Sequence, residues 1–229
     1  MATRFKDRAD AGRMLAAKLE HLKGQPLIVL ALPRGGVPVA REVARALNAP
    51  LDVLNVRKLG VPWHEELAMG AIGTGGVRVL NNEIVMATGV TKAALDEATA
   101  FQQLELDRRE RLYRGGRPAP RMHGRIAVLV DDGIATGATV RAAISVVRAM
   151  QPVRVVLAVP VAQESVAAEL RPMVDEFVCV STPGDLYGIG VWYDRFPQLT
   201  DAEVERIVLQ AGAEPATAAE VAAATPHRD

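Results

Sequence analysis

Runs of consecutive apolar residues alternate along the chain with segments in which apolar residues recur every three or four positions. The uninterrupted runs are the length of buried strands, and we expect strands at residues 27–32, 51–56, 77–80, 126–130, 153–159 and 177–180. The periodic segments predict helices at residues 8–22, 37–47, 91–114, 140–150, 163–170 and 201–210. Short apolar strands that alternate with helices are typical of a parallel sheet covered by helices on both faces. The pattern therefore predicts an α/β fold.

Two stretches fall outside this alternation. Residues 57–76 are polar and contain glycines and a proline, so we expect a loop there. The composition of residues 212–229 (Ala, Pro, Thr and Glu) supports no core and predicts a disordered tail. We expect a single domain over residues 1–211, with a helical insertion at about residues 91–117.

Charge and composition narrow the function. The chain has 27 basic and 27 acidic residues, and zero net charge argues against a general binder of nucleic acid or of a membrane surface. A local run of arginines between residues 108 and 125 is interpreted as a solvated face. No apolar stretch is long enough to span a membrane and no signal core precedes the first helix, so we expect a cytoplasmic protein. The lone cysteine, Cys179, lies in an apolar run and is expected to pack in the core.

The most informative segment is residues 128–139, which read Val-Leu-Val-Asp-Asp-Gly-Ile-Ala-Thr-Gly-Ala-Thr. An apolar strand ends in two acids, and a loop of small and hydroxyl-bearing residues leads into a predicted helix. Small residues let the backbone approach an anion closely, and the free N–H groups of a helix N-terminus favour phosphate. The residues that would form this cradle are Ala135, Thr136, Gly137, Ala138 and Thr139.

The two acids before the loop need a different partner. The carboxylates of Asp131 and Asp132 would repel a phosphate, so sugar hydroxyls, or a magnesium ion that touches them, are their natural partners. A ligand with both a phosphate and a ribose therefore fits this segment.

The segment resembles the ribose-phosphate signature of the type I phosphoribosyltransferases, in which an apolar strand, two acids and three further positions precede Thr-Gly-x-Thr. The resemblance extends more loosely over residues 27–196, and the overall pattern is most similar to bacterial members whose acceptor is not assigned. It implies a parallel sheet flanked by helices, with a small hood formed by about residues 181–200 and N-terminal residues.

The resemblance also implies an activity. The family transfers the phosphoribosyl group of phosphoribosyl pyrophosphate (PRPP) to a nitrogenous acceptor, here expected to be a nucleobase, with Mg²⁺ and with release of pyrophosphate. By this resemblance Thr136, Gly137 and Thr139 would hold the 5′-phosphate. Asp131 and Asp132 would hold the ribose hydroxyls and the metal, directly or through water and ligand.

Pyrophosphate would be held by residues at the ends of two other strands. Ligands of parallel α/β sheets lie beyond the carboxyl ends of the strands. Arg34, Gly35 and Gly36 resemble the pyrophosphate loop of the family, because backbone N–H groups and a guanidinium suit a multivalent anion. Lys58 is the second candidate for binding pyrophosphate and is also the candidate catalytic cation. Arg57 is a weaker candidate for the same role. A plain strand–helix turn and a solvated loop charge are the alternatives.

Residues 60–70 should correspond to the mobile loop that covers the site in this family. Glu65 and Glu66, with His64, are candidates for handling a proton of the acceptor. Some purine-specific relatives carry an acid for this task at the position of Ala135, so that mechanism is in doubt here. A solvated acidic loop is the alternative.

Aromatic residues gather late in the chain, where acceptor recognition is expected. Four of the nine Phe, Trp and Tyr residues lie between residues 187 and 196, and aromatic faces stack on heterocyclic bases. Tyr187 and Trp192 are the candidates for acceptor binding. An aromatic cluster that closes the core, or a contact between subunits of a homodimer, is the alternative.

Two other functions compete with catalysis. A non-catalytic sensor of PRPP or a nucleotide could retain the acid pair and the anion sites. A regulator that binds RNA through the arginine run would show an RNA affinity that falls steeply with salt.

Overall fold

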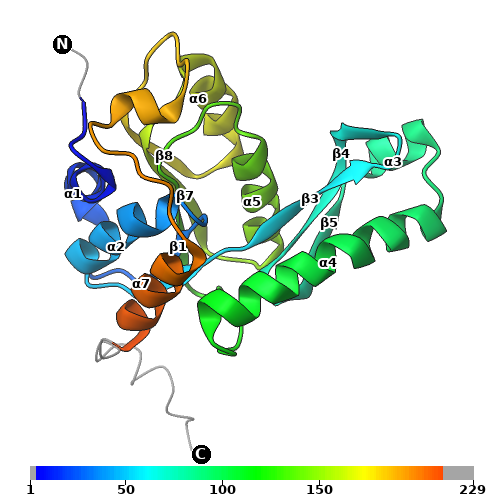
Figure 1. Ribbon diagram of the computed structural model, residues 1–229, viewed down its shortest axis with the longest axis horizontal. Helices are drawn as coiled ribbons and strands as arrows, with labels where there is room; N and C mark the ends of the chain where they lie inside the picture. The colour runs from blue at the N-terminus through cyan, green and yellow to red at the C-terminus, as the bar shows by residue number, and fades with distance from the viewer. Residues whose placement is uncertain (1–3, 214–229) are drawn as a thin grey trace, which may run out of the picture.

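The centre of the protein is a five-stranded sheet in the computed structural model, which describes residues 4–213. The strand order is β2 (Leu51–Val53), β1 (Leu27–Ala31), β6 (Ile126–Val130), β7 (Arg154–Val161) and β8 (Glu176–Ser181) (Figure 1). Every neighbouring pair in this sheet is parallel. The predicted α/β fold with a parallel sheet is confirmed.

Helices cover both faces of this sheet, because successive side chains of each strand point to opposite sides. In β6, Val128 and Val130 join a buried cluster with one set of helices, and Ala127 and Leu129 join a cluster with another. The first set comprises α1 (Arg8–Lys18), α2 (Gly36–Leu47) and α7 (Asp201–Ala213). The second comprises α5 (Ala138–Ala149) and α6 (Glu164–Leu170).

The prediction of a loop at residues 57–76 is wrong. An antiparallel sheet forms there from β3 (Val56–Val61), β4 (His64–Gly73) and β5 (Val77–Leu80). It carries α3 (Asn82–Thr88), and α4 (Lys92–Arg114) runs back from it to the main body (Figure 1). We call residues 56–114 the arm.

The arm is ordered because its strands and α4 share an apolar core. Leu59 and Met69 are fully buried on the face of the sheet that packs against Leu95 and Leu106 of α4. Polar residues alternate with these apolar ones, and the alternation predicts strands rather than a loop. Pro62 and Trp63 form the turn between β3 and β4.

A buried ionic cluster anchors the C-terminal end of α4 to the main body. The guanidinium of Arg114 lies 2.9 Å from Asp52 at β2 and 3.0 Å from Glu110. The Glu110 carboxylate also accepts hydrogen bonds at 2.7 Å from the Asn55 side chain and from the Thr74 hydroxyl. Breaking a buried pair of this kind leaves an uncompensated charge, so this end of α4 is held firmly.

The N-terminal segment and the segment after β8, for which we expect a hood, pack together. The Phe5 N–H donates to the Trp192 carbonyl at 2.9 Å, and the Asp194 N–H donates to the Phe5 carbonyl at 2.9 Å. The Phe5 and Tyr193 rings, with centroids 5.3 Å apart, form a buried cluster with Val161. Short 3₁₀ turns complete the described chain: Glu20–Leu22, Thr74–Gly76, Arg171–Met173 and Ile189–Trp192.

Three other expectations concern single segments. The disordered tail predicted for residues 212–229 falls almost wholly outside the described residues. No helix among residues 4–213 is both long and apolar enough to cross a bilayer. Cys179 lies in β8 and is partly buried, and burial raises the pKa of its thiol to about 11, which agrees with packing rather than with nucleophilic chemistry.

Candidate functional site

The loop between β6 and α5 has the backbone features expected of an anion cradle. Gly137 adopts φ +73°, and the α5 helix begins directly after it. The side chains of Thr136 and Thr139 are exposed at this helix N-terminus. Arg141 in the first turn of α5 donates from Nη1 to the Thr136 carbonyl at 2.8 Å. This hydrogen bond fixes the loop to the helix that follows it. The free N–H groups and the positive end of this 12-residue helix therefore face one space, and the two threonines are exposed beside it.

The acid pair lies directly before this cradle and is mostly withdrawn from water. The Asp132 N–H donates to Oδ1 of Asp131 at 2.8 Å. Burial, and next the neighbouring carboxylate of Asp132, raise the pKa of Asp131 well above its ordinary value of 3.8. Burial also raises the pKa of Asp132, although Arg8 opposes this shift. A cation, or hydroxyl groups that donate to these carboxylate oxygens, would favour the ionised form of both acids.

Arg8 is a site residue that the sequence analysis missed. Its Nε lies 2.8 Å from Oδ2 of Asp132, and both side chains are 10% exposed. The guanidinium also stacks 3.7 Å from the centroid of the Phe196 ring and donates to the Pro197 carbonyl at 2.8 Å. The Tyr193 hydroxyl donates to the main-chain carbonyl of Asp132 at 2.6 Å. The hood thus reaches the acid pair through one arginine and one tyrosine.

The pair of Arg8 and Asp132 should behave as a coupled unit in unfolding. We expect Arg8→Gln and Asp132→Asn each to lower the free energy of unfolding by about 3 kcal/mol, because each leaves the other side chain buried without its charge partner. The double variant should lose less than the sum of the two, with a coupling energy of about 1–3 kcal/mol. Urea denaturation of the four proteins measures this cycle, and additive losses would contradict the pairing.

The glycine loop after β1 packs against the same acids. A Cβ on Gly35 would lie 2.0 Å from Oδ2 of Asp132, and one on Gly36 would lie 2.9 Å from Cα of Asp131. No side chain fits at either position. The backbone of residues 33–36 and the acid pair therefore form one continuous wall, at the adjacent carboxyl ends of β1 and β6.

Arg34 is held at the edge of this wall by α7 and α4. Its Nη1 lies 3.7 Å from Oδ1 of Asp201, and its side chain is 41% exposed. The same oxygen accepts from the Tyr113 hydroxyl at 2.6 Å, and Arg108 approaches Asp201 at 3.4 Å. The Tyr113 hydrogen bond, and then Arg108, lower the pKa of Asp201. Asp201 is therefore an ionised partner that limits where Arg34 can point.

The comparison with known families decides the assignment. The family model described as "Phosphoribosyl transferase domain" matches residues 3–187. The chain belongs to the phosphoribosyl transferase family.

Similar proteins agree with this membership. The crystal structure of TT1426 from Thermus thermophilus is 44% identical in sequence with a TM-score of 0.84, and the match covers 90% of this chain and 98% of that one. Two Mycobacterium tuberculosis proteins, from strains CDC 1551 / Oshkosh and ATCC 25618 / H37Rv, are each named as candidate phosphoribosyl transferases. Both are 53% identical over 200 residues, which are 87% of this chain and 45% of theirs. The chain therefore spans about half the length of these curated relatives.

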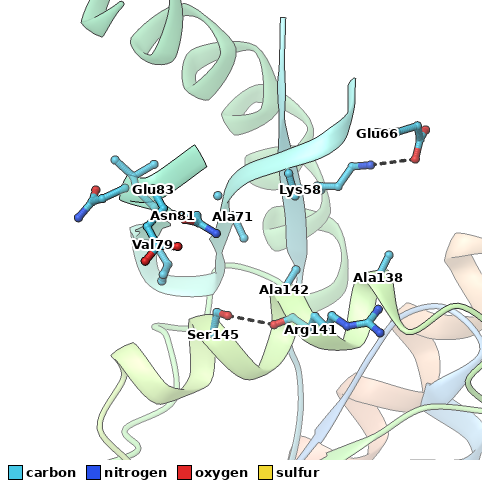
Figure 2. A pocket seen from close by; sticks show the side chains of 14 residues that line it. Lys58, Glu66, Ala71, Val79, Asn81, Glu83, Ala138, Arg141, Ala142 and Ser145 are labelled. Atoms are coloured by element: carbon cyan, nitrogen blue, oxygen red, sulfur yellow. Dashed lines mark hydrogen bonds and ion pairs between the residues drawn. The ribbon is translucent and has the colours of Figure 1, made fainter. Parts of the chain in front are cut away.

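Within the phosphoribosyl transferase domain, the arm places Lys58 beside the anion cradle. Lys58 on β3 pairs with Glu66 on β4 at 3.3 Å. Figure 2 shows this pair above α5, where a cavity of about 770 Å³ lies between the arm and Ala138, Arg141 and Ser145. Arg57 points to the other face and donates to Gln102 of α4 at 2.8 Å. The structure thus separates the two candidate cations and puts Lys58, not Arg57, on the cavity that Ala138 at the start of α5 also lines.

The remaining sequence candidates lie on several separate parts of the structure. Glu65 and Glu66 are exposed near the turn of the β3–β4 hairpin, so the arm displays them to solvent. Tyr187 is 95% exposed, whereas Trp192 packs partly against the hood cluster. Ala135 lies partly exposed in the loop before the cradle. The structure does not bring these residues together around one acceptor.

A magnesium ion fits the donor set only together with a substrate. Among residues 4–213 no group of three or more His, Cys, Asp and Glu side chains gathers as a metal cage. Asp131 and Asp132 supply two carboxylates, and Mg²⁺ is typically bound by one or two carboxylates with waters and substrate phosphates completing its shell. The residues present therefore fit a metal that arrives with a phosphorylated ligand.

The tether on Arg34 gives a second testable expectation. Asp201→Asn should raise the KM for a pyrophosphate-bearing donor by at most about fivefold, because a half-exposed ion pair is worth about 1 kcal/mol or less. Tyr113→Phe should give a smaller increase, since the carboxylate of Asp201 remains. Initial rates over a donor series measure both, and a fall in kcat without a change in KM would contradict a positioning role.

Proposed function

We propose that the protein transfers the phosphoribosyl group of PRPP to a nitrogenous acceptor, a nucleobase in the simplest case, and releases pyrophosphate in a Mg²⁺-dependent reaction. The observation that carries this proposal is the continuous wall in which the anion cradle, the acid pair and the glycine loop meet. Such a wall offers a phosphate site, a hydroxyl or metal site and a second anion site in one row. PRPP presents these groups in that order.

Each part of the wall would hold one part of the donor. Thr136, Gly137 and Thr139 would bind the 5′-phosphate through hydroxyl and backbone N–H groups. Asp131 and Asp132 would accept hydrogen bonds from the ribose hydroxyls.

The other phosphate end would meet the cationic side of the wall. Arg34 would bind pyrophosphate with the backbone of Gly35 and Gly36. Lys58 would also bind pyrophosphate. It can separate from Glu66 because an exposed ion pair such as theirs is weak.

The reaction breaks the bond between C1′ and the pyrophosphate oxygen and forms a bond between C1′ and the acceptor nitrogen. The electron pair of the broken bond leaves with pyrophosphate, and the acceptor loses a proton. A bound Mg²⁺ would neutralise charge on the pyrophosphate. The chain's own residues would position the donor, and the nearby carboxylates would stabilise positive charge that develops on the sugar ring. Glu65 and Glu66 are the proposed proton acceptors, since Ala135 offers none.

The test is release of pyrophosphate when the full chain is incubated with PRPP, Mg²⁺ and a panel of purine and pyrimidine bases. We expect release with at least one base and none without a base beyond slow hydrolysis. The base that gives release also names the acceptor. Tight PRPP binding by calorimetry without release for any base would reject catalysis.

The exposed positions of Glu65, Glu66 and Tyr187 favour one second candidate, a PRPP or nucleotide sensor. A sensor needs the donor wall but no assembled acceptor site. The same two measurements separate the functions, because a sensor binds PRPP and releases nothing. In either case we propose a cytoplasmic protein of nucleotide metabolism.

A further inference from the structure

The α4 helix has two apolar faces, and only one of them packs against other parts of residues 4–213. The inner face places Leu95, Leu106 and Tyr113 in buried positions against the arm and the main body. On the outer face, Phe101 and Leu104 are each 71% exposed. Large apolar side chains in adjacent turns of a helix are unusual on a free surface.

The outer face continues on both sides of this apolar pair with opposite charges. Its members are Glu97, Phe101, Leu104 and Arg108, which follow one another at intervals of four, three and four residues. This spacing keeps them on one stripe of a helix and is the spacing of a coiled-coil seam. We call these four residues the outer stripe.

Two outer stripes that run in opposite directions are complementary to each other. If two α4 helices pack antiparallel about a two-fold axis between residues 102 and 103, Phe101 meets the Leu104 position of the other copy. In the same register Glu97 meets the Arg108 position. Both apolar contacts and both charge contacts then occur twice, as in any two-fold symmetric interface.

The charges on the stripe are available for this pairing. Glu97 is exposed and has no ion-pair partner among residues 4–213. Arg108 is paired with Glu105 at 2.8 Å and Asp201 at 3.4 Å, yet its side chain remains 49% exposed. A guanidinium with five donors can bind a further carboxylate.

The groove beside the stripe leaves room for a second copy. A hollow of about 960 Å³ runs between α4 and the β3–β4 hairpin, and Phe101 and Leu104 form part of its wall. Small residues such as Ala94 and Ala98 line it as well, and the charged residues Lys58, Glu65 and Glu66 lie along its hairpin side.

We propose that two copies of this chain form a symmetric dimer through the outer stripes of their α4 helices, packed antiparallel. A single helix pair buries less surface than a standard protein interface, so the dimer dissociates at micromolar concentration. The proposal is independent of the phosphoribosyl transfer proposed above.

Sedimentation velocity of the full chain over a concentration series tests this dimer. Glu97→Arg and Arg108→Glu should each raise the dissociation constant roughly tenfold, since two symmetric attractions become repulsions. The double variant Glu97→Arg/Arg108→Glu should restore the dimer because it exchanges the two charges. An equimolar mixture of the two single variants should restore it too, as a heterodimer.

Controls separate this contact from general effects. Lys18→Glu on α1 changes the net charge equally, lies outside the stripe and should leave the dissociation constant unchanged. Phe101→Ser with Leu104→Ser should give a folded monomer by circular dichroism and sedimentation. A monomer at all concentrations, a dimer unaffected by either charge reversal, or a failure of the mixture to restore it would each overturn the proposal.

Discussion

The variant Asp131→Asn should release pyrophosphate at least about 100-fold more slowly than the unaltered chain, the typical loss when one preorganised electrostatic group is removed from a site. It should nevertheless unfold at a higher temperature in the absence of ligands. Both outcomes follow from one feature, a carboxyl group kept in a poorly hydrated position beside a second carboxyl group. The Asp131 carboxylate lowers the stability of the ligand-free protein, and it would stabilise a bound donor.

The gain in stability should depend on pH in a defined direction. Because burial and Asp132 raise the pKa of Asp131 above 3.8 in the folded state, the folded chain binds more protons than the unfolded chain between the two pKa values. The unaltered chain therefore loses stability as pH rises through this window, whereas the variant does not. The difference between them should vanish below the unfolded pKa and be complete above the folded one.

Thermal unfolding at several pH values and a pyrophosphate assay measure these effects together. Asp96→Asn is the matched control, since Asp96 forms only a surface pair with Arg78 at 3.1 Å on the arm. It should change neither quantity. Asp131→Asn with full turnover would remove Asp131 from the proposed site, and the double variant with Asp132→Asn extends the same test to its neighbour.

The variant Gly35→Ala should disable the site by displacement rather than by loss of a chemical group. The added methyl carbon would lie 2.0 Å from Oδ2 of Asp132, so the loop or the acid must move. Gly35 has φ −59°, which suits alanine, so the effect is one of space and not of backbone conformation. We expect a loss of kcat/KM of more than about tenfold and a destabilisation of about 1–3 kcal/mol, the usual cost of overpacking.

A second glycine provides the comparison. A Cβ on Gly184 would meet nothing closer than 3.8 Å, at Oε2 of Glu164, so Gly184→Ala should retain activity and stability. Steady-state rates and urea denaturation of the two variants decide the matter. Equal activity in both would show that the glycine loop does not abut the acid pair in solution.

Local pattern is enough to predict the main sheet and the donor segment. The strand expected at residues 126–130 has the same bounds as β6, because an apolar run that ends in two acids marks both ends of the strand clearly. The residues of the cradle follow β6 in sequence, so their proximity needs no knowledge of the rest of the fold.

The parts that sequence reasoning misses depend on contacts between distant residues. Arg8 lies 124 residues from Asp132, and nothing near Arg8 marks it as the partner of an acid. The glycines and Pro62 of residues 57–76 make a loop the local prediction, although apolar residues alternate there as in strands, and the order of the arm depends on α4, which follows later in the chain. For Arg141 a local signal exists. It follows Gly137 by four residues, which is about one helical turn, so its side chain can reach back to the cradle.

The firm anchoring of one end of α4 has a mechanical consequence. The helix of 23 residues is about 35 Å long, and Arg114 in its buried ionic cluster acts as a pivot at one end. A tilt of about 5° about this pivot would carry the far end, and with it the hairpin, through about 3 Å. Tyr113 stands next to the pivot and would scarcely move, so Asp201 and Arg34 would keep their places. A small rotation at the buried end of α4 would therefore be amplified at the hairpin.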